Sequence, residues 1–279
     1  MTTALERKDY LSEVEPRWCP GCGDYGVLKS FTAALAQIGI PRENVVVISG
    51  IGCSSRFPHY TQTYGFHGIH GRAPVIALGV KITRPELSVW VVTGDGDALS
   101  IGGNHFIHAA RRNLDMTVIL INNFIYGMTG GQVAPTTPLT ATASTTPYGN
   151  FEQPFNLPYL AESSGAVYVA RWTAYHVRHV TKSIKEALAK KGFSFVEILA
   201  PCPTLYSRRN KLGDGLEQMI YYRENSEIRH GADTKSISLE FQGKIIVGKF
   251  VDTDRPTYLD AMNDYYARKF GEKYVQYKG

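Results

Sequence analysis

The stretch Gly94-Asp95-Gly96-Asp97-Ala98-Leu99-Ser100-Ile101-Gly102-Gly103-Asn104 follows an apolar, β-branched run and precedes a helical pattern. A second apolar run, residues 116–121, then leads into Asn122-Asn123. This order predicts a strand, a glycine-rich turn, a helix and a strand, the unit from which parallel sheets are built. Glycines let the backbone approach a diphosphate closely, and the start of the next helix offers unpaired N–H groups. The stretch therefore predicts a diphosphate site at the carboxyl ends of two strands.

Two polar residues of this unit have the chemistry of magnesium ligands. Asp95 and Asn123 each stand at the end of a predicted strand, and the carboxyl ends of parallel strands share one edge of a sheet. Their oxygens, with the backbone carbonyl of Ile125 as a third, suit an octahedral Mg²⁺ that bridges phosphates. An isolated Asp-Gly is common turn chemistry, so two ordinary βα turns are the alternative. The 25 residues between Gly96 and Asn122, which contain a helix and a strand, favour the metal and diphosphate site.

The rest of the chain alternates short β-branched runs with amphipathic helical stretches. This alternation predicts an α/β fold in which a mostly parallel sheet has helices on both faces. The expected strands are Asn44–Ser49, Val75–Val80, Ser88–Thr93, Met116–Asn122, Val167–Ala170 and Ser194–Leu199. The expected helices are Gly26–Ile38, Gly103–Asn113, Pro158–Ser164 and Tyr175–Lys190. We expect Thr173 to cap the start of the last helix and Gly192 to follow its end.

Size and composition indicate a globular protein. The chain has 279 residues, of which 43% are hydrophobic and 20% are charged, both near the averages for folded domains. Its net charge of +5 comes without a compact basic run, so neither nucleic acid nor a membrane surface is expected as a partner. The polar N-terminus is unlike a signal peptide, and no apolar run approaches the ~20 residues of a membrane helix. We therefore expect a cytoplasmic protein.

Two segments depart from the alternating pattern. Between Phe124 and Asn156 the chain is rich in Gly, Thr and Pro. A stretch of that length without regular structure is usually functional or mobile, and a disordered linker is the alternative. From Cys202 onward charges and tyrosines increase, and the pattern indicates a helix, a short hairpin and a terminal helix. We expect an α/β domain over residues 1–201 and an extension over residues 202–279 that contacts a partner or covers the metal site.

The chain has four cysteines, placed where they can meet. Cys19 and Cys22 form a Cys-x-x-Cys turn, a spacing that lets two thiolates converge on one metal or cluster. Cys53 and Cys202 each follow a predicted strand, so both reach the edge of the sheet where ligands bind. In a reducing compartment such cysteines argue for a metal site rather than disulfides. Spacing alone leaves a 4Fe-4S cluster, a structural Zn²⁺ and unrelated cysteines open.

Several motifs occur in a fixed order between about Trp18 and Cys202. They are WCPGCGDYGVL, GIGCSSR, HGRA, GDGDALSIGGNH, NNFIYGMTGGQVAPTTP and the final Pro-Cys-Pro. The Gly-Asp-Gly to Asn-Asn arrangement is similar to the thiamine-diphosphate motif of 2-oxoacid decarboxylases and transketolases. All the motifs together resemble the β subunits of the 2-oxoacid:ferredoxin oxidoreductases, most closely the 2-oxoglutarate type.

This resemblance implies a thiamine-diphosphate-binding fold with thiamine diphosphate, Mg²⁺ and one 4Fe-4S cluster as cofactors. It implies that the four cysteines, Cys19, Cys22, Cys53 and Cys202, hold the cluster. It also implies that Asp95, Asn123 and the Ile125 carbonyl hold Mg²⁺. No cysteine is left over for a second cluster. The residues expected around the cofactor are Gly52, Cys53, Ser54, Gly94, Asp95, Gly96, Asp97, Asn123, Ile125, Tyr126 and Gly127.

The resemblance also implies partners and a reaction. The half of the thiamine site that contacts the aminopyrimidine ring is expected on an α subunit, with most contacts to the 2-oxoacid and coenzyme A. The chain would then be inactive alone and would work in a dimer of αβ heterodimers, with ferredoxin as the electron acceptor. The implied reaction is the CoA-dependent oxidative decarboxylation of 2-oxoglutarate to succinyl-CoA and CO2, or the reverse, a reductive carboxylation.

Five residues near the motifs are candidates for substrate contact or catalysis: Arg56, His67, His70, Met128 and Thr129. Arg56 suits a substrate carboxylate, and a salt bridge to the partner or a phosphate contact is the alternative. The two histidines lie in a glycine-rich loop, where hydrogen bonding within the loop is the alternative to catalysis. Pyruvate-type members tend to have Asn where Met128 stands, which favours 2-oxoglutarate as the substrate.

Three other functions fit part of the sequence. The first is the same enzyme family acting on pyruvate or another 2-oxoacid. The second is a non-redox thiamine enzyme subunit whose cysteines hold zinc; it would be colourless, whereas a cluster gives a brown protein. The third is an iron-sulfur electron carrier without catalysis, which would leave the diphosphate motif unexplained.

Overall fold

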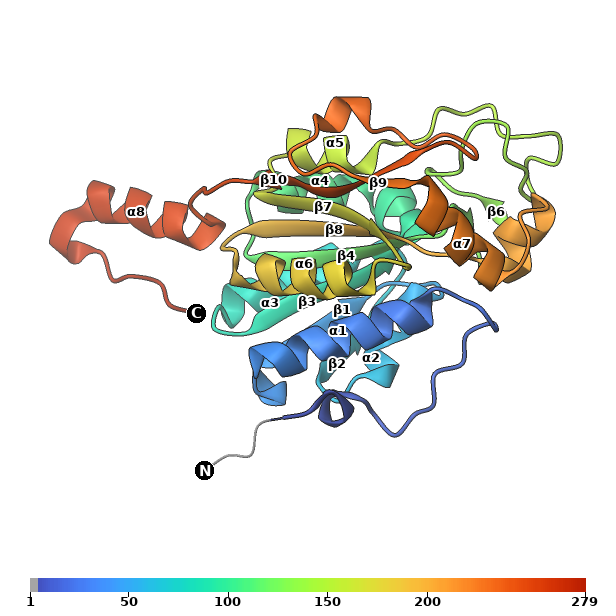
Figure 1. Ribbon diagram of the computed structural model, residues 1–279. Helices are drawn as coiled ribbons and strands as arrows, with labels where there is room; N and C mark the ends of the chain where they lie inside the picture. The colour runs from blue at the N-terminus through green and yellow to red at the C-terminus, as the bar shows by residue number, and fades with distance from the viewer. Residues whose placement is uncertain (1–4) are drawn as a thin grey trace.

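The computed structural model describes residues 5–279 and has an eight-stranded sheet at its centre (Figure 1). Residues 1–4 of the expected first domain lie outside the described part. The strands lie in the order β2-β1-β3-β4-β8-β7-β10-β9, of which the first six are mutually parallel. The bounds are β1 Val45–Ser49, β2 Tyr64–His67, β3 Ser88–Gly94, β4 Met116–Asn122, β7 Tyr168–Thr173, β8 Phe193–Leu199, β9 Ser226–Ile228 and β10 Ile245–Asp252. A separate small pair consists of β5 Ile125–Tyr126 and β6 Gln132–Val133.

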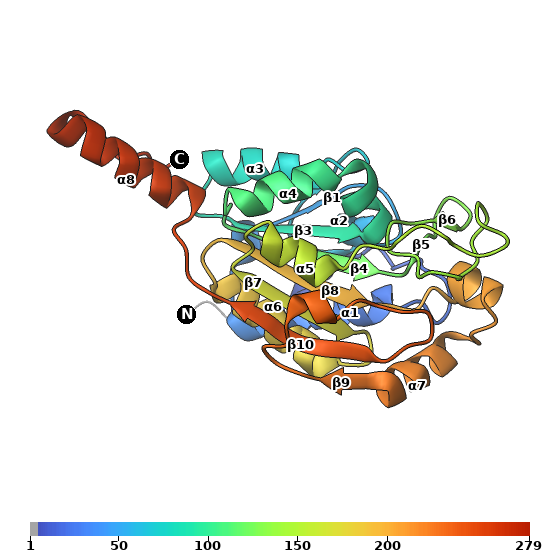
Figure 2. The ribbon, with the colours of Figure 1, turned by 90° about the horizontal axis from the view of Figure 1, so that it is seen from above.

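Helices cover both faces of this sheet, as the sequence predicts. In two views at right angles, α1 and α6 lie on one face and α3, α4 and α5 on the other (Figures 1 and 2). The bounds are α1 Asp24–Ile38, α2 Phe57–Tyr60, α3 Ala73–Thr83, α4 Gly103–Arg111, α5 Leu157–Ser163, α6 Val177–Ala189, α7 Gly215–Asn225 and α8 Tyr258–Phe270.

Each face of the sheet has its own apolar cluster. One contains Phe31 of α1 and Ile184 of α6, and the other contains Ala77 of α3 and Phe106 of α4. The central strands β4 and β8 are buried at each position, as expected for parallel strands covered on both sides. The continuous β-branched runs of the sequence follow from this double burial.

One predicted strand is wrong. Residues Val75–Val80 lie inside helix α3. A short apolar run does not distinguish a buried strand from a buried helix. Pro74 sits in the first turn, where a helix needs no N–H donor. Ala73, Ala77 and Lys81, each four residues apart, are buried along one side of this helix.

Two details near the carboxyl ends of the strands also differ from the prediction. Residues Tyr64–His67 form the edge strand β2, although the sequence predicts a loop from Gly65 onward. All four residues of this strand are exposed, so the sequence shows no buried apolar pattern there. Thr173 does not cap α6, because it is the last residue of β7 and His176 stands at the N-cap. The Thr173 hydroxyl instead lies 2.9 Å from Nδ1 of His176.

The Gly-, Thr- and Pro-rich segment is a folded lobe rather than a linker, since the strands before and after it belong to one sheet. The Thr137 hydroxyl donates to the Phe124 carbonyl at 2.6 Å, and the Asn150 amide donates to the Thr137 carbonyl at 2.7 Å. Ala141 and Ala143 are buried within it. Side-chain hydrogen bonds thus replace regular secondary structure in this lobe.

The C-terminal extension adds two strands to the same sheet. β10 pairs antiparallel with β7, and β9 pairs parallel with β10. The expected short hairpin is therefore wrong, because a parallel pair needs a long connection, here residues 229–244. The helix and the terminal helix expected in this segment are α7 and α8.

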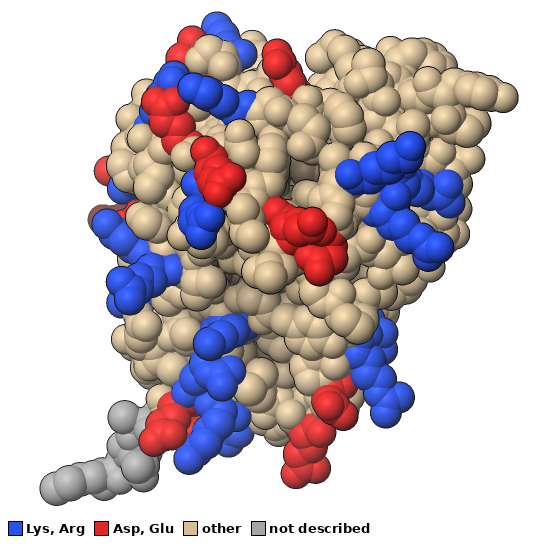
Figure 3. Space-filling model, turned by 45° about the vertical axis from the view of Figure 1, so that its right-hand side comes forward, with Lys and Arg blue, Asp and Glu red and all other residues tan. Residues whose placement is uncertain are grey.

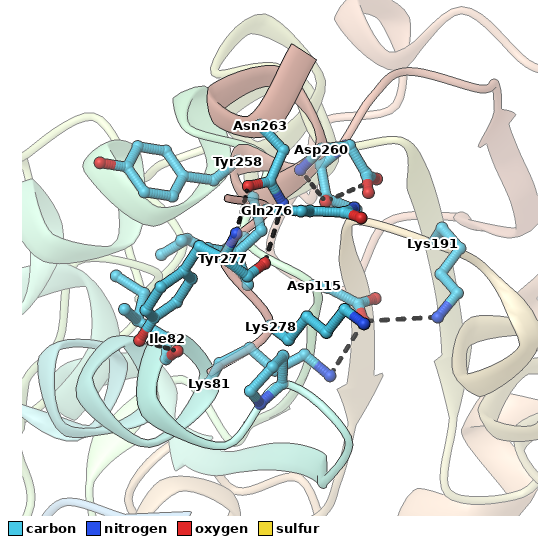
Figure 4. Close-up of a pocket in the computed structure, with 14 residues that line it drawn as sticks. Lys81, Ile82, Asp115, Lys191, Tyr258, Asp260, Asn263, Gln276, Tyr277 and Lys278 are labelled. Atoms are coloured by element: carbon cyan, nitrogen blue, oxygen red, sulfur yellow. Dashed lines mark hydrogen bonds and ion pairs between the residues drawn. The ribbon is translucent and has the colours of Figure 1, made fainter. Parts of the chain in front are cut away.

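Helix α8 projects from the body at the end of the sheet where the parallel strands begin (Figures 1 and 2). The chain after it turns back, and the Tyr277 hydroxyl donates to the Ile82 carbonyl at 3.1 Å. A cavity between this tail and the core includes Lys81, Asp115 and Asn263 in its lining (Figure 4). Among residues 5–279, no helix is long and apolar enough to cross a membrane.

Candidate active site

A pocket opens at the edge of the sheet where β1, β3 and β4 end, and we call it the strand-end pocket. Its lining consists of Ile51, Gly52, Cys53, Ser54, His70, Gly94, Asp95, Gly96, Asp97, Asn123, Ile125, Tyr126, Gly127, Met128 and Thr129. The eleven residues expected around the cofactor are all in this set, as are three of the five candidates for substrate contact. The structure thus brings together loops that lie far apart in the sequence.

Asp95 is a buried carboxylate in this pocket, with an exposed fraction of 2%. Its Oδ2 accepts a hydrogen bond from the Thr136 hydroxyl, and the backbone N–H of Asn123 also favours its charge. Burial still raises the pKa of Asp95 to about 7. Within residues 5–279 it forms no ion pair with a Lys or Arg. A divalent cation would supply the missing charge, so the donor set fits Mg²⁺.

Asn123 and Ile125, the other expected metal ligands, follow the end of β4. The Asn123 Oδ1 accepts from the Ile125 N–H at 3.3 Å, which holds the two residues in one tight turn. Both line the strand-end pocket together with Asp95. Since β3 and β4 are parallel neighbours, their ends present these oxygens from adjacent positions.

Asp97 makes its hydrogen bonds to the protein around the pocket. Its Oδ1 accepts from the backbone N–H groups of Ile51, at 3.1 Å, and Gly71, at 2.7 Å. The same oxygen lies 2.5 Å from Nδ1 of His70, and Oδ2 accepts from the Thr93 hydroxyl at 2.7 Å. Asp97 therefore connects β3 with the loops that follow β1 and β2, and it orients the His70 ring.

Gly96 is required by a close approach. A Cβ atom at this position would overlap the ring of Tyr126, whose hydroxyl donates to the Gly96 carbonyl at 3.2 Å. The Tyr126 ring also lies 6.0 Å, centroid to centroid, from the ring of His70. Gly96 of the Gly-Asp-Gly motif therefore leaves space for the Tyr126 ring as well as for a ligand.

A second hollow adjoins the strand-end pocket and shares Ile51, Gly52 and Met128 with it. Arg56 and His67 line this hollow, not the pocket itself. Arg56 Nη1 donates to the Arg17 carbonyl at 3.1 Å, and the guanidinium lies 5.7 Å from the centre of the Tyr60 ring. His67 Nδ1 lies 2.9 Å from the Ser55 carbonyl oxygen.

Met128 and Thr129 lie at the mouth of the pocket, in the turn between β5 and β6. Half of the Met128 surface, 50%, is exposed, and it borders both hollows. The Thr129 hydroxyl donates to Oε1 of Gln132 at 2.7 Å. These side chains are therefore placed to meet a molecule that enters the pocket.

The four cysteines lie near one another beside the strand-end pocket. Cys19 and Cys22 lie in the turn before α1, Cys53 follows β1, and Cys202 follows β8. Gly127 lies against two of them, because a Cβ there would be 3.5 Å from the Cys53 Sγ and 3.7 Å from the Cys202 Sγ. Cys53 therefore belongs both to the pocket and to the cysteine group.

The chemistry of these thiols fits an iron-sulfur cluster. Burial raises the pKa of Cys53 to about 12 and also raises the pKa of Cys22 and Cys202, so their thiolates need a cationic partner. In the part of the chain that the structure describes, no three His, Cys, Asp or Glu side chains are close enough to hold a single ion. A 4Fe-4S cluster binds each thiolate through a different iron, so its ligands need not converge on one point.

Sequence reasoning missed two buried residues of this region. Thr136, in the folded lobe, donates a hydrogen bond to Asp95. The motif NNFIYGMTGGQVAPTTP contains this threonine, but the motif alone did not indicate its role. Asp24, which is 2% exposed, accepts from the Cys22 thiol at 3.5 Å, and burial raises its pKa to about 7. Neither position has a local signal, because its importance comes from tertiary contacts.

Comparisons with known proteins agree with this geometry. Residues 50–198 match the profile described as thiamine pyrophosphate enzyme, C-terminal TPP binding domain. The 2-oxoglutarate synthase subunit KorB of Methanothermobacter marburgensis is 45% identical over 95% of this chain and 92% of its own length. The 2-oxoglutarate oxidoreductase subunit KorB of Mycobacterium tuberculosis is 53% identical over 81% of this chain and 61% of its own. The chain belongs to the 2-oxoacid:ferredoxin oxidoreductase β-subunit family.

A solved structure places it within that family. The 2-oxoglutarate:ferredoxin oxidoreductase from Magnetococcus marinus with 2-oxoglutarate, coenzyme A and succinyl-CoA bound superposes with a TM-score of 0.86. It is 37% identical, and the match covers 97% of this chain and 93% of that one. The predicted family and fold are confirmed. The chain is an enzyme subunit of the 2-oxoglutarate type with a thiamine-diphosphate-binding domain.

Proposed function

We propose that this chain, with its α subunit, carries out the reaction of 2-oxoglutarate, coenzyme A and two oxidised ferredoxins. The products are succinyl-CoA, CO2, two reduced ferredoxins and a proton. The observation that carries the proposal is that Cys53 and Asp95 line the same pocket, so a diphosphate cofactor and a cluster ligand are neighbours. Neither a simple electron carrier nor a non-redox thiamine enzyme needs that arrangement.

We assign Asp95, Asn123 and the Ile125 carbonyl to Mg²⁺, because they are the oxygens at the ends of β3 and β4. The backbone from Gly94 to Gly96 would lie against the diphosphate. Thiamine diphosphate, when bound, supplies the electron sink for breaking the bond between the keto carbon and the carboxyl group. The protein's part is to hold the diphosphate end and exclude water from the pocket.

We assign Cys19, Cys22, Cys53 and Cys202 to a single 4Fe-4S cluster, which accepts and releases electrons one at a time. The support is the free thiol state of all four and the position of the Cys53 and Cys202 sulfurs beside Gly127. Free thiols grouped in this way are typical of metal sites in proteins of a reducing compartment. The cytoplasm is accordingly the proposed location.

The substrate contacts that we propose come from the pocket and the hollow beside it. His70 is fixed by Asp97 at Nδ1, which leaves its Nε2 to exchange a proton or hydrogen bond with a ligand. Arg56 in the second hollow suits the distal carboxylate of 2-oxoglutarate, which pyruvate lacks. Met128 and Thr129 at the mouth would sort substrates by size and polarity.

The α subunit is proposed to close the strand-end pocket. The Magnetococcus enzyme has 2-oxoglutarate, coenzyme A and succinyl-CoA bound, and the likeness of the two proteins supports the same ligands here. We propose a dimer of αβ heterodimers, in which the α subunit contributes the aminopyrimidine half of the site. In the reductive direction the same complex would fix CO2.

The test uses the complex of this chain and its α subunit, purified anaerobically. We expect about four irons per β chain and CoA-dependent reduction of methyl viologen that favours 2-oxoglutarate over pyruvate. Cys53→Ser should lose iron and dye reduction, whereas Ser55→Ala, two residues away, should keep both. The Ser55 hydroxyl has no hydrogen-bond partner in the described residues, so this control removes no hydrogen bond.

Other outcomes would correct particular parts of the proposal. Zinc in place of iron would overturn the cluster and leave only the thiamine site. A preference for pyruvate would overturn the substrate. Met128→Asn is the sharper substrate test, because it should shift the ratio of kcat/KM values toward pyruvate without changing the iron content.

A further inference from the structure

An external electron carrier would come nearest to a cluster held by these cysteines where the cysteine site reaches the surface. Of the four cysteines, Cys19 is exposed, whereas Cys22, Cys53 and Cys202 are partly buried. The Cys53 side faces the strand-end pocket, which the α subunit is proposed to close. If the cluster is present as proposed, the turn at Cys19 is therefore its free side.

The segment that follows Cys202 packs directly against this turn. A Cβ at Gly21 would lie 3.2 Å from the Cα of Gly215 and 3.7 Å from the Cγ of Pro203. Pro203 also lines a shallow hollow together with Ser207, Arg208, Lys211 and Asp214. The hollow thus adjoins the Cys-x-x-Cys turn.

This segment is strongly basic. Residues 203–213 include Arg208, Arg209 and Lys211, all exposed, and no acidic residue. We call these three the basic loop. None of the three forms an ion pair within residues 5–279. Figure 3 turns this end of the molecule forward and shows a group of basic side chains on the right, with an acidic group beside it toward the centre.

The nearest acidic residues along the chain are engaged by the backbone of α7. Asp214 accepts from the N–H groups of Leu216 and Glu217, at 2.8 and 3.0 Å. The Glu217 carboxylate in turn accepts from the Asp214 N–H at 2.7 Å. Both carboxylates thus cap a helix, and within residues 5–279 neither forms an ion pair with the basic loop.

We propose that the basic loop and the exposed turn at Cys19 form the docking surface for an electron carrier with an acidic surface, of the ferredoxin class. This inference rests on the proposed function and names where its acceptor binds. Each docking passes one electron from the reduced cluster to the oxidised carrier, so two dockings complete one oxidation. Opposite surface charges speed such encounters and make their rate sensitive to salt.

The test compares two variants that each remove three positive charges. Arg208→Gln/Arg209→Gln/Lys211→Gln alters the basic loop, and Arg268→Gln/Lys269→Gln/Lys273→Gln alters exposed residues of the α8 arm. Each αβ complex is assayed with 2-oxoglutarate and coenzyme A, using an acidic ferredoxin and, separately, methyl viologen as acceptor. Iron content and retention of the α subunit are measured on the same preparations.

For the basic-loop variant we expect kcat/KM for ferredoxin to fall roughly tenfold or more at low salt. Its salt dependence should become nearly flat, while dye reduction, iron content and α-subunit retention stay at the level of the unmodified complex. The α8 variant should behave as the unmodified complex with both acceptors.

Three results would overturn the docking surface. Unchanged ferredoxin kinetics in the basic-loop variant would show that the carrier docks elsewhere. An equal fall in the α8 variant would show an effect of net charge alone. Loss of the α subunit would show that the basic loop is a subunit interface. An unmodified complex that reduces neither acceptor would instead refute the proposed function, and that outcome is distinguishable from the other three.

Discussion

Buried charged side chains are paired at one end of the sheet and unpaired at the other, within residues 5–279. At the end beneath the C-terminal tail, Lys81 is 7% exposed, and its Nζ lies 2.9 Å from Oδ2 of Asp115 and 2.9 Å from the Leu87 carbonyl (Figure 4). At the other end, Asp95 in the strand-end pocket and Asp24 beside Cys22 are each 2% exposed, and within residues 5–279 they have hydrogen bonds but no ion pair. Burial raises the pKa of both to about 7.

This difference in charge pairing indicates the functional end of the sheet better than cavity size does. The hollow beneath the tail is larger, about 350 Å³ against about 80 Å³ for the strand-end pocket. The buried Lys81 there is already paired with Asp115, so its charge needs no ligand. In the strand-end pocket, burial disfavours the charged form of Asp95, and a bound metal ion would stabilise that form. Uncompensated buried charge therefore marks the functional end of this sheet.

The largest effect is expected from removing the charge of Asp95. Asp95→Asn keeps the shape of the side chain but takes away an anionic Mg²⁺ ligand. We expect dye reduction by the αβ complex to fall by roughly 10³-fold, with loss of bound thiamine diphosphate. The melting temperature of the cofactor-free chain should not fall, because an uncompensated buried charge is gone. Full activity in this variant would refute the contrast between the two ends.

The second test concerns a buried ion pair between the two ends. Arg171 Nε lies 2.6 Å from Oε2 of Glu197, both are 0% exposed, and Asn122 donates to Oε1 at 2.8 Å. Arg171→Met should lower the free energy of unfolding by about 3–5 kcal/mol, since it leaves the Glu197 charge alone. Urea unfolding followed by tryptophan fluorescence measures this. The double variant Arg171→Met/Glu197→Leu should recover most of the loss, and failure to do so would argue against charge as the cause.

A smaller effect is expected at the end beneath the tail. Lys81→Met removes the partner of Asp115, whose side chain is 22% exposed and also lies 3.9 Å from Lys191. The free energy of unfolding should fall by about 1–2 kcal/mol, because Asp115 keeps access to water and to a second lysine. Activity of the folded complex should not change. A loss of cofactor binding in this variant would show that the two ends are coupled.

The smallest expected effect is on the pH dependence of stability, at a residue outside both ends of the sheet. Burial, with the neighbouring His179, lowers the pKa of His176 from 6.5 to about 4. The folded chain therefore binds this proton less well than the unfolded chain, so stability is lost as pH falls from about 6.5 to about 4. His176→Gln should remove on the order of 1 kcal/mol of that loss, measured by urea unfolding at pH 7 and pH 4.5. An unchanged pH profile would rule out His176 as its source.

Much of the central architecture can be predicted from the sequence, because strands such as β4 and β8 are buried on both faces and read as continuous apolar runs. The Gly-Asp-Gly to Asn-Asn spacing and the cysteines following β1 and β8 locate the pocket for the same reason: parallel strands end at one edge. These features can be predicted because they depend on local sequence pattern and on the rule that parallel strands end at one edge of the sheet.

What could not be predicted depends on contacts between distant segments. The apolar run Val75–Val80 has residues that suit a buried strand as well as a buried helix. Its helical conformation in α3 depends on packing against the sheet. The pairing of β10 with β7 joins residues about 80 positions apart, and nothing within either segment encodes it. The bond from Thr136 to Asp95 is likewise a product of the folded lobe.

The positions of the cysteines along the chain have a further consequence. Cys53 is 31 residues after Cys22 and 149 residues before Cys202. One inorganic centre bound to all of them would act as a cross-link that closes a short and a very long loop at once, and it would restrict the unfolded chain accordingly. Oxidative loss of the iron would open both loops together and loosen the turn before α1 from the segment after β8. Exposure to oxygen would then shorten the lifetime of the protein in the cell, as well as stop its chemistry.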